Sequence, residues 1–276
     1  MNRISTLLLL AAYLCAPLSS AANELPAVIA LFGDSTTVGY VPPRDHNGNA
    51  YPDKFEERFG NGTTTRGIPT SHLSSLLNNG TPVYPSIVTN WGVGGTSTSV
   101  QSYNGVDRMN SNLATAASTH NGYAYYVLII YGSNDFGYGL SANDTGANIE
   151  IMINIARGRG FTPIVGTTSP RSDRNLSDTN QKIKDAAANR GAPVVDHFTA
   201  FNNYPGGPYT LMTSEISVTS GQPVQLHPTS DGYRFMAQNW FDGVLKNELI
   251  SRASAAHIGA ISILLLDDDE EIIVIP

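Results

Sequence analysis

The stretch Ala27-Val28-Ile29-Ala30-Leu31-Phe32-Gly33-Asp34-Ser35-Thr36 decides the fold. Its apolar run ends abruptly in Gly-Asp-Ser, which predicts a buried strand that delivers a serine to the edge of a sheet. Ser35 then has two interpretations. It caps the helix that follows, or it is a nucleophile at the carboxyl end of the first strand, where ligands bind in open α/β sheets. The tripeptide alone does not decide between them.

Beyond this strand, strand-like and helix-like segments alternate along the chain. The segment 123–131 is nearly continuous in β-branched and aromatic residues, as expected for a central strand buried on both faces. Such alternation predicts an α/β fold, a three-layer α/β/α sandwich with a mainly parallel sheet of about five strands. Strands are expected at 28–32, 86–90, 123–131, 161–168 and 193–196. Helices are expected at 52–59, around 73–77, at 106–117, 143–157, from an N-cap at Ser177 to Asn189, and at 230–251, with a long irregular stretch at 198–226.

The N-terminal segment 1–22 has the features of a secretory signal peptide. Arg3 precedes an apolar run, and Ser20 and Ala22 are the small residues that a signal peptidase requires. The only cysteine, Cys15, falls inside this segment, so the mature chain would have no disulfide, thiolate metal site or cysteine nucleophile. We therefore expect a secreted or periplasmic protein, and a cysteine-free exported chain favours a bacterial source.

The remaining chain divides into a domain at 23–252 and a tail at 253–276, in which apolar and acidic runs alternate. A partly disordered end is the favoured interpretation of the tail, and a sorting or sheet-edge role is the alternative. The apolar runs of the tail are too short to span a bilayer. With a net charge of −7 and no basic stripe, the chain is not expected to bind nucleic acid. We expect a monomer.

Four residues fall at strand ends or just before the last helix: Ser35, Gly95, Asn134 and His227. Each has an ordinary structural explanation, namely a helix cap, a tight turn, an Asx-turn and an X-Pro turn. In a parallel sheet, however, these positions converge on one edge. A serine needs a base such as histidine, and an oxyanion needs fixed donors, which the N–H groups of Ser35 and Gly95 and the Asn134 amide would supply. Their order and placement together favour acyl transfer.

The same order resembles the SGNH hydrolase superfamily, also called GDSL esterases and lipases. Gly33-Asp34-Ser35-Thr36 is similar to the first family block, and Asn90-Trp91-Gly92-Val93-Gly94-Gly95 to the second. Gly132-Ser133-Asn134-Asp135 resembles the third block, and His227-Pro228 the last. The resemblance implies a flavodoxin-like sheet and ester hydrolysis through an acyl-serine intermediate, without a metal or cofactor. The expected substrates are short-chain esters, lipid esters or acetylated sugars.

The sequence departs from the family pattern at one position. The family usually has an aspartate three residues before the histidine, where this chain has Val224. A carboxylate there orients the imidazole and stabilises its protonated form. Three possibilities remain open: a backbone carbonyl such as that of Val224 holds the ring, another acid such as Glu215 or Asp231 reaches it, or the protein is a weakened or inactive relative.

Two other functions compete with ester hydrolysis. The missing aspartate and the many Tyr and Asn residues at 198–210 suggest a non-catalytic carbohydrate-binding or surface protein on the same fold. The glycines in Gly137-Tyr138-Gly139-Leu140-Ser141-Ala142 loosely fit a dinucleotide fingerprint, but they do not follow the first strand. No Gly-x-Ser-x-Gly is present, which excludes an α/β-hydrolase elbow.

Overall fold

The computed structural model describes residues 27–252 except 65–66, 101, 123 and 218–219. The predicted signal peptide at 1–22 and the tail at 253–276 lie outside the described residues. Of these, residues 27–249 belong to one compact unit, whose fold is described below. Among the helices that the structure describes, none has both the length and the apolar composition to cross a bilayer.

The unit is built around a sheet of five parallel strands in the spatial order β2-β1-β3-β4-β5. This is the flavodoxin-like order, so the predicted sheet is confirmed. All seven residues of β1 are buried, as expected for a strand with neighbours on both sides and helices on both faces. The strands are β1 (Ala27–Gly33), β2 (Ser86–Asn90), β3 (Ala124–Ile130), β4 (Thr162–Gly166) and β5 (Val194–Val195).

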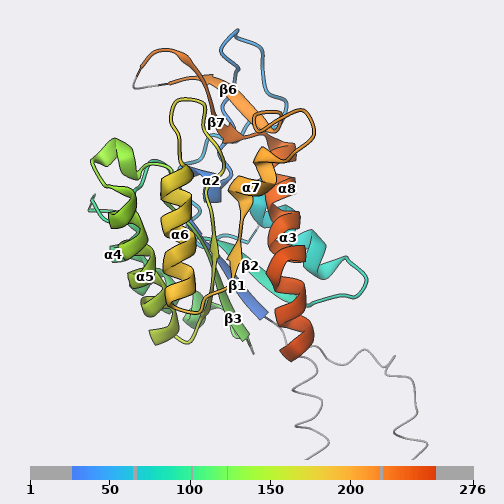
Figure 1. Cartoon of the computed structure of the whole chain (residues 1–276). Coiled ribbons are helices and arrows are strands. Elements are labelled where there is room, and N and C mark those ends of the chain that lie inside the picture. The colour runs from blue at the N-terminus through green and yellow to red at the C-terminus, as the bar shows by residue number, and fades with distance from the viewer. Residues whose placement is uncertain (1–26, 65–66, 101, 123, 218–219, 253–276) are drawn as a thin grey trace, which may run out of the picture. The chain divides into compact units, whose positions relative to one another are not determined.

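Helices cover both faces of the sheet and complete a three-layer sandwich (Figure 1). Successive residues of β1 point to opposite faces, so Leu31 joins one core cluster and Phe32 the other. One face packs against α4 (Gly105–Thr119), α5 (Ala142–Gly158) and α6 (Ser177–Asn189). The other packs against α3 (Ile68–Asn78) and α8 (Ser230–Trp240), which continues through a π-helical turn, Phe241–Leu245. At the start of α6 the N-cap is Leu176, one residue before the predicted Ser177.

The prediction of an irregular stretch at 198–226 is wrong. Residues His197–Asn202 form helix α7, capped by the Asp196 side chain, which accepts from Thr199 N at 3.0 Å. Met212–Ile216 (β6) and Pro223–Pro228 (β7) pair as an antiparallel hairpin. The hairpin escaped prediction because β6 is mostly polar and because β7, although Val224 and Leu226 alternate with polar residues, is short and has a proline at each end.

The prediction of a helix at 52–59 is also wrong. Its backbone bonds to distant segments instead: Phe55 exchanges hydrogen bonds with Val41 at 2.9 Å, and Arg58 O accepts from Gly94 N at 2.7 Å. These long-range bonds replace the local bonds that a helix would make, so the segment runs extended along the loops at the carboxyl end of the sheet.

Short elements gather at that carboxyl end (Figure 1). Helix α2 (Ser35–Val38) follows β1 after one residue, and the 3₁₀ helix η1 (Asp135–Tyr138) follows β3 after four residues. Asn90, the last residue of β2, is fully buried and links three segments. Its Nδ2 lies 2.9 Å from both Thr37 O and Thr70 Oγ1, while its Oδ1 accepts from Gly92 N at 3.0 Å. The loop that carries Gly95 is therefore fixed against α2.

Gly92 and Gly94 offer a matched test of this close packing. A Cβ at Gly92 would lie 2.6 Å from Val38 N in α2, whereas the nearest atom to a Cβ at Gly94 would be Arg58 O at 3.6 Å. We expect Gly92→Ala to destabilise the fold by about 1–3 kcal/mol, because backbone must move to make room. Gly94→Ala should change stability little. Urea denaturation of both variants checks this, and equal midpoints would contradict the packing described.

Candidate active site

Three side chains form a continuous hydrogen-bonded series at the carboxyl end of the sheet. Ser35 Oγ lies 3.0 Å from His227 Nε2, and His227 Nδ1 lies 2.8 Å from Glu215 Oε1. His227 and Glu215 are both mostly buried, with side chains 11% and 12% exposed. The structure thus brings together the predicted Ser35 and His227 and adds a carboxylate at the far nitrogen of the ring.

Local structure explains the placement of Ser35. The fully buried Asp34 caps α2 by accepting from Thr36 N at 2.9 Å, so that Ser35 is the first residue of the helix. Helix capping was one of the two interpretations of Ser35. In the structure the cap of α2 is Asp34 instead. The hydroxyl of Ser35 is left to bond with the histidine.

A β-bulge explains the placement of His227. Ser214 pairs with Gln225 and Met212 pairs with Pro228, so two residues of β7 lie opposite the single residue Thr213. An extra residue of this kind re-aims the side chains that follow it. Here it turns the His227 ring to the side of the hairpin on which Glu215 lies, as their hydrogen bond shows.

Glu215 stands directly across the hairpin from Val224, the position where the family usually has its aspartate. Of the acids and the backbone carbonyl that the sequence left open as partners of His227, Glu215 is the one that contacts the ring. Asp231 is 75% exposed and pairs with Arg234 at 2.9 Å, and the contact of His227 Nδ1 is with a carboxylate rather than a backbone carbonyl. Asp196 caps α7 and pairs with Lys184.

The surroundings of Glu215 keep it ionised. Burial alone would raise its pKa, but the hydrogen bond and charge of His227 and the hydroxyl of Thr213, at 2.8 Å, outweigh burial and hold the pKa of Glu215 below its ordinary value. Thr213 Oγ1 also lies 2.9 Å from His227 O, so it joins the two strands at the site. Thr213 was not predicted, and its only signal was its place two residues before Glu215.

The His227 ring also packs against an aromatic neighbour that sequence reasoning missed. The Tyr40 ring centroid lies 4.8 Å from that of His227, and Tyr40 O accepts from Tyr233 OH at 2.8 Å. Tyr40 follows α2 after one glycine, so the segment that presents the serine also restrains the histidine ring. Nothing in the sequence distinguishes this tyrosine from the others.

Two of the three predicted oxyanion donors, the Asn134 amide and the N–H of Gly95, are carried by loops that bond to each other. Asn134 Nδ2 lies 3.0 Å from Thr96 O, which directs its amide to the loop that carries Gly95, and 3.4 Å from Asp34 Oδ2. Gly95 has φ +78°, a conformation that favours glycine, and a Cβ there would meet nothing within 4 Å. Asn134 and Gly95 thus border the same end of the sheet as Ser35.

The model of the GDSL-like lipase/acylhydrolase family matches residues 31–235, most of the chain. The chain belongs to this family. It is therefore a member of a family of carboxylic ester hydrolases, and the resemblance drawn from the four sequence blocks is confirmed. No curated protein matched the sequence.

Solved structures of GDSL-type proteins share the fold. A lipase/acylhydrolase from Enterococcus faecalis superimposes with a TM-score of 0.56 at 19% identity, covering 77% of this chain and 92% of its own. A carbohydrate acetylesterase from Sinorhizobium meliloti gives 0.53 at 12% identity, covering 79% and 98%. A catalytic mutant of an acetylxylan esterase from Geobacillus stearothermophilus gives 0.53 at 16% identity, covering 79% and 94%. At these identities the likeness shows the three-layer fold alone.

The residues that the structure describes also bear on metal binding. Within those residues, no group of three or more His, Cys, Asp or Glu side chains is arranged to hold a metal ion. Of the acidic and imidazole groups at the strand ends, Glu215 and His227 are engaged with each other and with Ser35, and Asp34 accepts from a backbone N–H group.

The GDSL-family aspartate, Asp34, is a titrating group at the site. Burial raises the pKa of Asp34 from 3.8 to about 6, and neither the hydrogen bond from Thr36 N nor the attraction of His227 offsets it. Folding therefore favours the protonated carboxyl. Its stabilising contribution is fully present below pH 3.8 and is lost as the pH rises through about 6.

This pKa predicts the effect of Asp34→Asn on stability. The amide keeps the cap acceptor and stays uncharged at every pH. The variant should therefore gain stability relative to the wild type as the pH rises from 4 to 8. The expected gain is about 2–3 kcal/mol, since a shift of one pKa unit corresponds to about 1.4 kcal/mol. Urea denaturation at several pH values measures the difference. Asp231→Asn, at an exposed position, is the control. A pH-independent difference between Asp34→Asn and the wild type would contradict the prediction.

Proposed function

We propose that the protein hydrolyses carboxylic esters by transferring the acyl group to Ser35. His227 acts as the general base, and Glu215 orients the imidazole and stabilises its charged form. The observation that supports this most directly is the continuous series from Ser35 Oγ through His227 to Glu215, with steps of 3.0 and 2.8 Å. It has the order of roles of a Ser-His-acid triad.

The first half of the reaction uses the two nitrogens of His227 for different tasks. The ionised Glu215 accepts the Nδ1–H, which leaves Nε2 as an acceptor for the proton of Ser35. Ser35 Oγ then attacks the ester carbonyl carbon as its proton moves to Nε2. The negative charge that develops on the carbonyl oxygen is stabilised by the N–H groups of Ser35 and Gly95 and by the Asn134 amide.

The second half restores the enzyme. The tetrahedral intermediate collapses, the alcohol leaves with the proton held on Nε2, and the acyl group remains on Ser35. Water then gives its proton to His227 and attacks the acyl carbon, and Ser35 recovers its proton as the carboxylic acid is released. Short-chain esters, lipid esters and acetylated sugars all fit this sequence of steps.

A non-catalytic carbohydrate-binding role on the same fold was suggested by the missing aspartate at position 224. Glu215 supplies the carboxylate that position 224 lacks, because it contacts the ring nitrogen that the aspartate would bind. The Tyr and Asn residues at 198–210 are the remaining support for that role. We also propose that the enzyme acts outside the cytoplasm, as a secreted or periplasmic protein, on the strength of the signal-like segment 1–22.

Replacing the nucleophile tests the proposal directly. Ser35→Ala should lower kcat for p-nitrophenyl acetate by at least about 10³-fold, since nothing else in the site accepts the acyl group. A fluorophosphonate probe should label the wild type and leave the variant unlabelled. An unchanged melting temperature shows that the variant is folded. Turnover by a folded Ser35→Ala that matches the wild type would refute the mechanism.

Replacing Glu215 tests the assignment of the acid. Glu215→Gln should lower kcat on the order of 10²–10⁴-fold with KM little changed, because an amide cannot stabilise the imidazolium and favours the wrong ring tautomer. Asp231→Asn, the other acid that the sequence left open, should retain full activity. If Asp231→Asn proves the more damaging of the two, the assignment to Glu215 is wrong.

A further inference from the structure

Tyr138 ends the short helix that follows the oxyanion amide, and its hydroxyl reaches the loop that carries the other donor. It is the last residue of η1, whose N-cap is Asn134. Tyr138 OH donates to Gly95 O at 2.9 Å. Tyr138 lies beyond the third sequence block, which ends at Asp135, and the reaction steps described above do not use its hydroxyl.

The turn that carries Asn134 is also joined to the loop of Gly95 at other points. Asn134 Nδ2 donates to Thr96 O at 3.0 Å, the carbonyl that follows Gly95 O along the chain. The buried Asp135 accepts from the N–H and the hydroxyl of Thr98 at 2.9 and 2.7 Å. The two donor loops are therefore fixed to each other, and the tyrosine makes the bond that lies at Gly95 itself.

Gly95 is the part of its loop that side-chain packing does not restrain. It is exposed, its φ is +78°, and a Cβ there would meet nothing within 4 Å. Its neighbours are held, because Gly94 N donates to Arg58 O at 2.7 Å and Thr96 is buried. The two peptide planes that meet at Gly95 can rotate more readily than at any other residue type. The hydroxyl of Tyr138 holds one of these planes by its carbonyl oxygen.

We propose that Tyr138 is a positioning residue of the oxyanion hole, whose hydroxyl restrains the backbone at Gly95 so that the Gly95 N–H keeps its direction. This inference rests on the proposed function. The negative charge on the ester oxygen develops only as the transition state forms, so a poorly directed donor lowers the rate without weakening substrate binding. Tyr138 acts through Gly95 and exchanges no proton with the substrate.

Tyr138→Phe tests this role, because it removes the hydroxyl and keeps the ring. The variant should lower kcat for p-nitrophenyl acetate by about 5–30-fold, less than the loss on the order of 10²–10³-fold that follows when an oxyanion donor is removed outright. KM should stay within about twofold of the wild-type value, since the lost stabilisation belongs to the transition state. The side chain is 43% exposed, so the melting temperature should change little.

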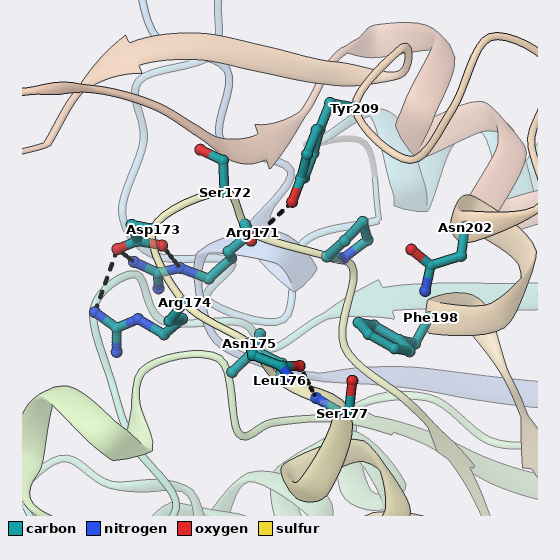
Figure 2. Close-up of a pocket in the computed structure, with 11 residues that line it drawn as sticks. Arg171, Ser172, Asp173, Arg174, Asn175, Leu176, Ser177, Phe198, Asn202 and Tyr209 are labelled. Carbon is teal, nitrogen blue, oxygen red and sulfur yellow. Dashed lines mark hydrogen bonds and ion pairs between the residues drawn. The ribbon is translucent and has the colours of Figure 1, made fainter.

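Tyr209→Phe is the matched control. Tyr209 is 41% exposed, and its OH also donates to a backbone carbonyl, that of Arg171, at 3.3 Å. Figure 2 shows this bond beside a cavity lined by the loop 170–177, which connects β4 and α6. The control thus removes the same kind of hydrogen bond from a tyrosine of similar exposure. It should leave kcat and KM unchanged, because Arg171 belongs to neither donor loop.

Two further measurements separate positioning from a general effect on the fold. In Tyr138→Phe, the NMR order parameter of the Gly95 amide should fall from about 0.85, typical of rigid backbone, toward about 0.6, and Tyr209→Phe should not change it. A phenylboronic acid forms a tetrahedral adduct with a catalytic serine and places an oxygen in the oxyanion hole. Its affinity should fall in Tyr138→Phe by about the same factor as kcat.

The outcomes distinguish this inference from the proposed function. An active wild type with equal kcat values in Tyr138→Phe and Tyr209→Phe would overturn the role of Tyr138 and leave ester hydrolysis standing. A Gly95 amide that stays rigid in Tyr138→Phe would also overturn it. A wild type without ester turnover, in which Tyr138→Phe still loosens the Gly95 amide, would refute the proposed function and retain the restraint on the loop.

Discussion

The hydrogen bond between His227 and Glu215 is the contact on which the site depends, and it exists only because β6 and β7 pair. Neither strand belongs to the central sheet, and the hairpin is held from both sides by loops. On the β6 side, Ser214 N donates to Tyr51 OH at 2.7 Å and His46 N donates to Ser214 O at 2.9 Å. On the β7 side, the loop 170–177 bonds to Gln225. The long polar loops at the carboxyl end of the sheet thus fix the acid and the base relative to the serine.

The structure that places Ser35 at the start of α2 lowers the stability of the fold. Asp34 must be buried to cap α2 beside β1, and a buried carboxyl in this position is destabilising once it ionises. The surrounding polar groups offset part of that cost: Thr36 N and the Asn134 amide both approach Asp34, and Asn90 secures the end of α2. The first sequence block therefore has two tasks, because its aspartate builds the helix start and its serine is the nucleophile that we propose.

The central sheet could be predicted from the sequence because its strands carry their own signal. The strands at 28–32 and 123–131 are apolar runs of the length expected for buried parallel strands, and the polar residues that follow them mark the functional edge. The segments 52–59 and 198–226 were mispredicted for the opposite reason. Their backbone bonds go to partners far away in the chain, such as Phe55 with Val41 and Glu215 with Val224, and local composition does not encode such pairings.

Glu215 shows that a family motif has the same limit as local composition: it does not reveal a partner on another strand. A sequence block can only be compared along the chain, where position 224 lacks a carboxylate. In space, however, the neighbour of position 224 is its cross-strand partner, and side chains of directly opposed residues lie on one face of a hairpin. A carboxylate at position 215 can therefore serve the same histidine from the facing strand, provided that the bulge opposite Thr213 turns the His227 ring to that face. The position of the acid is thus a property of the hairpin rather than of the block, and the loss of an aspartate from the block does not by itself mean the loss of the triad.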